Sequence, residues 1–203
     1  MKLYFAPGAC SLSPHIALRE AGLPFTLEQV DIFTGKTAGG EDFAAINPKG
    51  YVPALKLEDG SVLTEGAAIV QYIADLAPSV GLAPLPATLE RARLQEWLNF
   101  LASELHKAFS PLFRPGTSEA GRQEARAAIA RRLGHIETEL ADGRSYLLGD
   151  AFSVADIYLF VIAGWAEGKD IPLSAWPRLT ALLERVASRD SVREALNAER
   201  LAA

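Results

Sequence analysis

A proline-rich segment in the first half of the chain constrains its fold most. Residues 77–88 contain three prolines and one glycine and carry no charge. Proline lacks an amide proton and clashes with the preceding helical turn, so prolines at this spacing cannot lie within one helix. The segment therefore predicts a linker at 79–87 between a first domain at 1–78 and a second at 88–203.

The first domain has a mixed pattern. The aromatic run at 2–6 stops at Pro7-Gly8 and predicts a strand, followed by a helix that Ser11 or Ser13 can cap. Alternating residues at 26–32 predict a second strand. Further on, apolar runs flank Asp59-Gly60 and predict a hairpin, after which helical spacing resumes. This order implies a small open sheet covered by helices.

The second domain is predicted to be entirely helical, so the fold class is α/β followed by all-α. The expected helices span 89–112, 119–140, 154–166 and 175–198, the last with a break near Asp190. Ser153 and Asp156 have the spacing of a capping box, with Asp in place of the usual Glu. A helix start needs its free amides satisfied, so we assign Asp156 a structural role and not a catalytic one.

Composition excludes several functions. The formal charge of −5 argues against binding to nucleic acid or to an anionic membrane surface. The best membrane candidate is a ten-residue apolar run at 157–166, whereas about 20 residues are needed to cross a bilayer. No signal-peptide core precedes Pro7, and a cytoplasmic protein is expected.

Cysteine and histidine usage narrows the chemistry further. A single cysteine, Cys10, permits no internal disulfide and no cysteine-rich zinc site. The three histidines are far apart in sequence and lack metal-ligand spacing, so no metal site is predicted. Ser13 takes the place that a resolving cysteine would hold in a CxxC motif. Redox chemistry at Cys10 would therefore need an external thiol.

Cys10 is the first candidate for chemistry. Pro14 prevents the helix from beginning much before Ser11, which places Cys10 near the helix N-terminus. Unpaired amides and the positive end of the helix dipole stabilise a thiolate there. The alternative is a buried cysteine acting as a small apolar residue, and it stays open.

Two further segments can bind a ligand or serve the fold alone. Thr64-Glu65-Gly66 opens a helix, where free amides can receive a carboxylate and Glu65 can accept from an ammonium group. A threonine cap with a first-turn acid is the structural alternative. The bond between Val52 and Pro53 is trans by default, although X-Pro bonds are the common site of cis peptides.

The helix at 89–112 carries an unusual polar arc. It contains amide, hydroxyl and imidazole groups in place of the Lys and Glu expected of a solvated face. Its members are Gln95, Asn99, Ser103, His106 and Ser110. The arc favours the lining of a cleft, with an ordinary exposed face as the alternative.

Together these segments resemble the glutathione transferases, specifically the bacterial beta class. The resemblance spans essentially the whole chain: KLYFAPGACSLSPHIALRE, INPKGYVPAL and LTEGAAIVQYIAD in the first half, then EWLNFLASELHKAFSPLF and FSVADIYLF. It implies a thioredoxin-like domain followed by an all-helical domain, assembled as a homodimer.

The resemblance also assigns roles to residues. It implies a cis Pro53, pairing of the glutathione cysteine with the Val52 backbone, and Cys10 beside the tripeptide sulfur. The γ-glutamyl end falls on Glu65 and Gly66. Further contacts and a catalytic histidine are carried over to the following residues: Lys36, which is displaced by one residue from the family pattern, and Asn99, Ser103, Glu104, His106 and Lys107 of the helical domain.

The expected activity is conjugation of reduced glutathione, as co-substrate, to hydrophobic electrophiles, with no tightly bound cofactor. Thiol-disulfide exchange or peroxide reduction through Cys10 is a possible second activity. One alternative is a non-catalytic protein that binds glutathione or hydrophobic ligands. Another is a specialised glutathione-dependent isomerase or dehalogenase.

Overall fold

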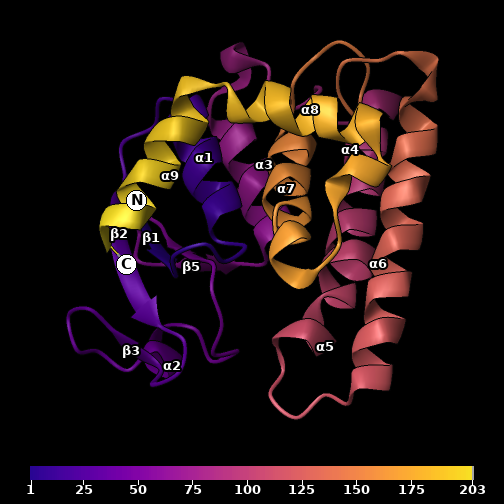
Figure 1. Cartoon of the computed structure of the whole chain (residues 1–203). Helices are drawn as coiled ribbons and strands as arrows, with labels where there is room; N and C mark the ends of the chain where they lie inside the picture. Colours follow the sequence, from indigo (N-terminus) through magenta and orange to yellow (C-terminus); the bar gives the residue numbers. More distant parts are fainter. Residues whose placement is uncertain (203) are drawn as a thin grey trace. The chain divides into compact units, whose positions relative to one another are not determined.

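The computed structural model describes residues 1–202 and divides the chain into two compact units. The first unit contains Met1–Ala83 together with the C-terminal segment that begins at Ser188. The second unit contains Pro84–Ala187. Figure 1 shows the elements of both units, and each unit is described below by itself.

The first unit is built on a five-stranded sheet with the order β3-β2-β1-β4-β5. Parallel pairing joins β1 to β2, whereas β1–β4, β4–β5 and β2–β3 are antiparallel. The Asp59-Gly60 turn joins β4 to β5, so the predicted hairpin is confirmed. The strands are β1 (Lys2–Phe5), β2 (Thr26–Asp31), β3 (Lys36–Thr37), β4 (Ala54–Lys56) and β5 (Val62–Thr64).

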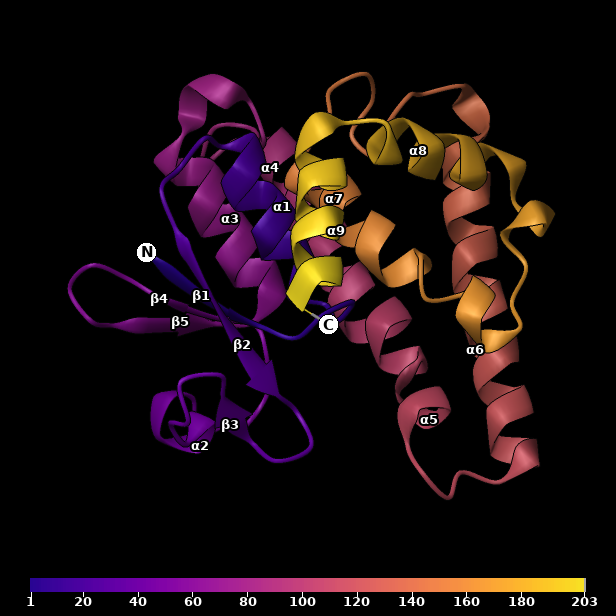
Figure 2. The same ribbon diagram turned by 60° about the vertical axis from the view of Figure 1, so that its left-hand side comes forward.

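Helices cover both faces of this sheet, because successive side chains on a strand point to opposite faces. Tyr4 on β1 packs with Phe43 of α2. Phe5, the next residue, contacts the ring of His15 on α1. Figure 2 shows α1 and α3 on one side of the sheet and α2 on the other. The helices are α1 (Leu12–Glu20), α2 (Phe43–Ile46), α3 (Gly66–Leu76), the short η1 (Pro78–Val80) and α9 (Asp190–Ala202).

The second unit is helical throughout its named elements, as predicted. Its most buried element is α7, where every residue except Phe160 is buried and which contacts α4, η2 and α8. Among the described residues, no helix is long and apolar enough to span a membrane. The helices are α4 (Leu89–Phe100), η2 (Leu101–His106), α5 (Ser110–Phe113), α6 (Glu119–Glu139), η3 (Leu140–Asp142), α7 (Val154–Ala163), η4 (Glu167–Lys169), η5 (Leu173–Ala175) and α8 (Pro177–Ala187).

The strand order and the helical second half confirm the predicted fold class: a thioredoxin-like sheet domain followed by an all-helical domain. The two units differ from the predicted boundaries 1–78 and 88–203 at the C-terminus. Residues from Ser188 onward belong to the first unit. The physical reason is that α9 packs on α1 and buries Val192, Ala195 and Glu199.

The start of α7 confirms the predicted capping box. The Asp156 carboxylate accepts hydrogen bonds from the Ser153 amide (2.9 Å), the Ser153 hydroxyl (2.8 Å) and the Leu147 amide (2.8 Å). Burial raises the pKa of the Asp156 carboxyl to about 6, against the opposing effect of these three hydrogen bonds. The residue is fully buried, so its role here is to hold the helix start and the loop before it.

Candidate functional site

Cys10 lies in the loop between β1 and α1, where its side chain is partly exposed. The thiol Sγ lies 3.5 Å from the backbone carbonyl oxygen of Val52 and donates to it. The peptide bond between Val52 and Pro53 is cis, as the family resemblance implied. The structure therefore brings together three of the predicted site residues, Cys10, Val52 and Pro53. It also excludes the alternative of a cysteine sealed in the core.

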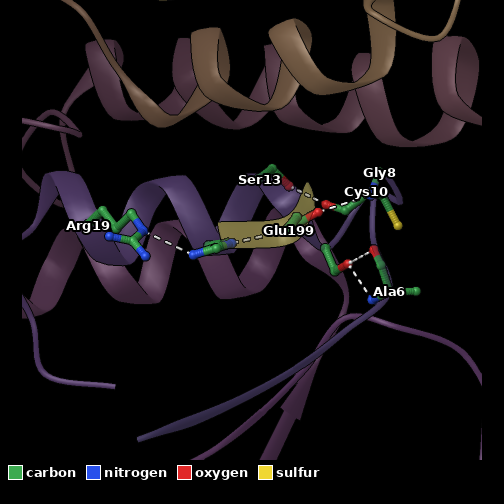
Figure 3. Close-up of polar contacts among 8 residues, drawn as sticks. Ala6, Gly8, Cys10, Ser13, Arg19 and Glu199 are labelled. Atoms are coloured by element: carbon green, nitrogen blue, oxygen red, sulfur yellow. Dashed lines mark hydrogen bonds and ion pairs between the residues drawn. The ribbon is translucent and has the colours of Figure 1, made fainter. Parts of the chain in front are cut away.

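The serines after Cys10 hold this loop, and they do not cap α1. Ser11 precedes the first residue of α1, but its hydroxyl accepts from the Ala6 amide (3.1 Å) and donates to the Ala6 carbonyl (3.2 Å). The Ser13 hydroxyl donates to the Cys10 carbonyl at 2.7 Å. The prediction that either serine caps the helix is wrong, because both side chains are used to close the loop on itself (Figure 3).

A series of hydrogen-bonded side chains runs along α1 to the same loop (Figure 3). Arg19 Nε donates to His15 Nε2 at 3.0 Å, and His15 Nδ1 lies 3.0 Å from Glu199 Oε1. The other Glu199 oxygen accepts from the Gly8 amide at 2.9 Å. Because the arginine can only donate, Nε2 is the acceptor and the His15 proton is assigned to Nδ1.

These hydrogen bonds position the Cys10 loop through Glu199, which lies close to the C-terminus of the sequence. His15 is fully buried and Glu199 is 3% exposed, so the carboxylate is held inside the protein, with one oxygen on the buried imidazole and the other on the Gly8 amide of the loop. Gly8 stands two residues before Cys10 and has φ +69°, a left-handed conformation that glycine adopts without strain. Sequence reasoning missed Glu199, because nothing in its own surroundings marks a partner 184 residues away.

Glu65 and Gly66 stand together at the start of α3. Glu65 has φ +69°, an uncommon conformation for a residue with a side chain, and Gly66 is the first helical residue. The expected threonine cap is absent: the Thr64 hydroxyl instead accepts from Lys49 Nζ at 3.0 Å. The structural alternative, in which Thr64 caps the helix, is therefore wrong.

Two residues that the sequence analysis did not select, Lys49 and Tyr51, bind Glu65. Lys49 Nζ donates to Glu65 Oε1 at 2.6 Å, and the Tyr51 hydroxyl donates to the same oxygen at 2.9 Å. The hydrogen bond to Glu65 raises the pKa of both Lys49 and Tyr51, so both stay protonated donors at neutral pH. The only sequence signal for them is their position between Pro48 and Pro53.

Lys36 is placed apart from these residues. It is an exposed residue on the edge strand β3, which pairs only with β2 in the sheet order, whereas Val52 precedes β4. Its assignment to the glycine end of glutathione stays a prediction.

In the second unit, the predicted long helix at 89–112 is interrupted. Residues Leu101–His106 form a π-helix, and a turn then leads into α5. Such π segments frequently occur at functional sites, and they shift the residues that follow around the helix. The single polar arc predicted from α-helical spacing is not kept, because His106 contacts α7 whereas Ser103 faces α6.

His106 faces α7 and an aromatic cluster. Its Nδ1 lies 3.0 Å from the Tyr158 hydroxyl, and its ring meets Trp165 edge-on at 5.1 Å. Trp165 also packs edge-on against Phe109 and Phe113, at 5.6 and 5.2 Å between ring centres. Phe113 is half exposed. We call His106, Phe109, Phe113, Tyr158 and Trp165 the aromatic cluster.

Ser103, Glu104 and Lys107 face the other way and line a hollow of about 350 Å³ with residues of α6. Glu104 forms an ion pair with Arg132 Nη2 at 2.7 Å. Asn99 lies one turn earlier on α4, where its amide donates to the Gln95 carbonyl. Of the predicted helical-domain residues, three thus line the hollow, His106 contacts α7, and Asn99 does not line the hollow. Among the described residues, no group of three His, Cys, Asp or Glu side chains could hold a metal ion.

Comparison with known proteins identifies related sequences and structures. Residues 8–76 match the family described as Glutathione S-transferase, N-terminal domain, and residues 100–190 match Glutathione S-transferase, C-terminal domain. The chain is 44% identical over 201 residues to Glutathione S-transferase GstA of Escherichia coli O157:H7, covering 99% of this chain and all of that protein.

Solved structures of glutathione S-transferases are also similar to this chain. A sphingomonad glutathione S-transferase complexed with glutathione has a TM-score of 0.96 and 50% identity, with 99% of this chain and all of that chain covered. A bacterial beta class glutathione S-transferase of Sphingomonas chungbukensis has a TM-score of 0.95 and 52% identity, with 98% of each chain covered. This chain is therefore similar to both along its whole length.

Proposed function

Because this chain belongs to the glutathione S-transferase family, we propose that it conjugates reduced glutathione to hydrophobic electrophiles. The observation that carries the proposal is the grouping of Cys10, Val52 and Glu65 in the first unit of a chain that is 50% identical to a structure complexed with glutathione. We place the tripeptide cysteine against the Val52 backbone, its sulfur beside Cys10, and its γ-glutamyl end at Glu65 and Gly66.

The reaction needs a thiolate and an acceptor. The positive end of the α1 dipole, two residues after Cys10, favours the anionic sulfur of bound glutathione over its thiol. The thiolate donates its electron pair to an electrophilic carbon. With an aryl halide, a C–S bond forms and halide leaves with the electrons of the broken bond.

The aromatic cluster of the second unit is the proposed acceptor site. Phe113 is exposed and Trp165 partly exposed, and these two edge-on rings offer apolar surface to a flat, apolar molecule. His106 is assigned the role of contacting this acceptor, with its ring held by the Tyr158 hydroxyl. Asn99, Ser103, Glu104 and Lys107 are proposed as further glutathione contacts of a homodimer, and Lys36 as a contact for the glycine carboxylate.

A conjugation assay tests the proposal. With 1-chloro-2,4-dinitrobenzene as acceptor, the purified protein should accelerate product formation, and the rate should saturate with glutathione concentration. Retention on immobilised glutathione without any acceleration would favour the non-catalytic binding protein. If the protein neither binds glutathione nor accelerates the reaction with any electrophile, the proposed function is wrong.

Cys10 is proposed to carry a second reaction, thiol-disulfide exchange. Its thiolate attacks oxidised glutathione, forms a mixed disulfide with one half and releases the other half as a reduced thiolate. After incubation with oxidised glutathione, intact mass should show one added glutathionyl group on the wild-type protein and none on Cys10→Ala. An adduct on Cys10→Ala would disprove this assignment.

The same variant separates the two activities. If bound glutathione is activated by the α1 terminus and not by the Cys10 sulfur, Cys10→Ala should conjugate 1-chloro-2,4-dinitrobenzene within about tenfold of the wild-type rate. Cys10→Ser, which keeps a hydroxyl donor near the Val52 carbonyl, is the matched control. A loss of conjugation far beyond tenfold in both variants would assign the sulfur to conjugation as well.

A further inference from the structure

Three side chains meet where α3 begins, and two of them act on the third. Lys49 Nζ and the Tyr51 hydroxyl both donate to Glu65 Oε1, at 2.6 and 2.9 Å. Lys49 also donates to the Thr64 hydroxyl at 3.0 Å, which anchors the ammonium group over the start of the helix. We call Lys49, Tyr51 and Glu65 the Glu65 cluster. It sets one cation and one anion side by side.

The Glu65 cluster is accessible to a ligand. The Lys49 and Glu65 side chains are 47% and 54% exposed. An ion pair exposed to this degree contributes little to folding, because water screens it and both side chains lose conformational freedom. The pair can therefore exchange one partner for another at small energetic cost.

We propose that Lys49 determines specificity for the glutamyl end of glutathione by binding its α-carboxylate, beside Glu65, which the proposed function already assigns to this end and which would face the α-ammonium group. The inference rests on the proposed function and adds to it a residue that sequence reasoning did not select. The glutamyl end is a zwitterion that carries both charges on one carbon atom. A neighbouring cation and anion on the protein complement it, and no charge is left unpaired when the Lys49–Glu65 pair opens.

Tyr51 has a separate, positioning role in this exchange. When Lys49 turns to the ligand carboxylate, the Tyr51 hydroxyl remains to hold Glu65 Oε1 in place. The hydrogen bond to Glu65 raises the Tyr51 pKa, so this donor keeps its proton throughout the neutral range. The carboxylate therefore stays oriented for the α-ammonium group without help from Lys49.

Two glutathione analogues separate the charges of the glutamyl end. The first, 4-aminobutanoyl-cysteinylglycine, lacks the α-carboxylate, and the second, glutaryl-cysteinylglycine, lacks the α-amino group. Calorimetric titration of the wild-type protein should give about tenfold weaker binding for the first analogue than for glutathione, the effect of one charge-assisted hydrogen bond. If the wild-type protein bound 4-aminobutanoyl-cysteinylglycine as tightly as glutathione, the inference would be overturned without the use of any variant.

Variants then assign the charges to residues. Lys49→Met should weaken glutathione binding about tenfold but leave binding of 4-aminobutanoyl-cysteinylglycine unchanged. Glu65→Gln should weaken glutathione but leave glutaryl-cysteinylglycine unchanged. The matched control is Lys56→Met, which removes the same charge from an exposed position on β4 and should change none of the affinities.

The outcomes are distinct. Wild-type-like glutathione binding by Lys49→Met, or an equal loss for glutathione and for the analogue without the α-carboxylate, overturns the role of Lys49. A wild-type protein that gives no binding heat with glutathione instead refutes the proposed function, and this inference with it. Thermal unfolding of Lys49→Met should match the wild type, because the ion pair it loses is exposed.

Discussion

Asp156→Ala is expected to lower the free energy of unfolding by about 3 kcal/mol at pH 7, and the melting temperature by about 10 °C. The substitution removes the acceptor of two buried amides, those of Leu147 and Ser153, and of the Ser153 hydroxyl. A buried donor left without a partner costs about 1–3 kcal/mol. Urea unfolding followed by circular dichroism measures the change.

The control for this variant is Asp150→Ala. Asp150 is an exposed aspartate in the loop before α7, and its replacement should change the free energy of unfolding by less than about 0.5 kcal/mol. If Asp156→Ala were as stable as the control, the capping box would contribute nothing to the free energy of unfolding, which contradicts this prediction.

The pH dependence of this contribution follows from the direction of the pKa shift. Burial raises the Asp156 pKa from 3.8 to about 6 in the folded protein, so the folded state holds the proton more tightly than the unfolded chain. The protonated form therefore adds stability that is fully present below about pH 4 and is lost as the pH rises to about 6.

Subtraction of the Asp156→Asn unfolding curve isolates this group from the other acids. The stability of the wild type relative to Asp156→Asn should fall by about 3 kcal/mol in total between about pH 3 and pH 7, with about 2 kcal/mol of this between pH 4 and pH 6, and stay level above that. A relative stability that rises over the same interval would show that the three hydrogen bonds outweigh burial.

Glu199→Ala should impair both folding and activity. It removes the acceptor of the partly buried Gly8 amide and of the fully buried His15 Nδ1, at an expected cost of about 3 kcal/mol in the free energy of unfolding. The Gly8 loop carries Cys10, so glutathione conjugation should fall on the order of tenfold in kcat/KM from misplacement of the site. Urea unfolding and the conjugation assay measure the two effects.

Two further variants separate positioning from general destabilisation. Glu194→Ala removes an exposed carboxylate from the same helix, the partner of Arg19 Nη1, and should leave stability and activity nearly unchanged. Glu199→Gln keeps one acceptor oxygen and should be intermediate in stability. If the rate of Cys10 alkylation by iodoacetamide in Glu199→Ala equals that of the wild type, Glu199 does not position the loop.

Local patterns in the sequence predicted much of the fold. The Asp59-Gly60 pair fixes a turn, Ser153 and Asp156 fix a helix start, and the chain breaks near Asp190, all through interactions between residues close in sequence. What the sequence could not show is which unit α9 joins. That is decided by contacts with α1, which lies at the opposite end of the chain.

Parts of the candidate site depend on such distant contacts. Ser11 has an ordinary capping pattern, yet its hydroxyl binds Ala6. Lys49 belongs to no recognisable motif. It binds Glu65 only because the β4–β5 hairpin brings the two residues together in the fold. The π-helix at Leu101–His106 cannot be recognised from α-helical spacing. The contact between His106 and Tyr158 could therefore not be predicted from the polar arc.

A crystal structure of the protein soaked with reduced glutathione tests the central claim most directly. The account predicts that the tripeptide cysteine pairs with the Val52 backbone, that its sulfur lies beside Cys10, and that its glutamyl end meets Glu65 with the carboxylate on Lys49. Glutathione bound elsewhere, or no glutathione at these residues at a concentration that saturates the conjugation assay, would contradict it.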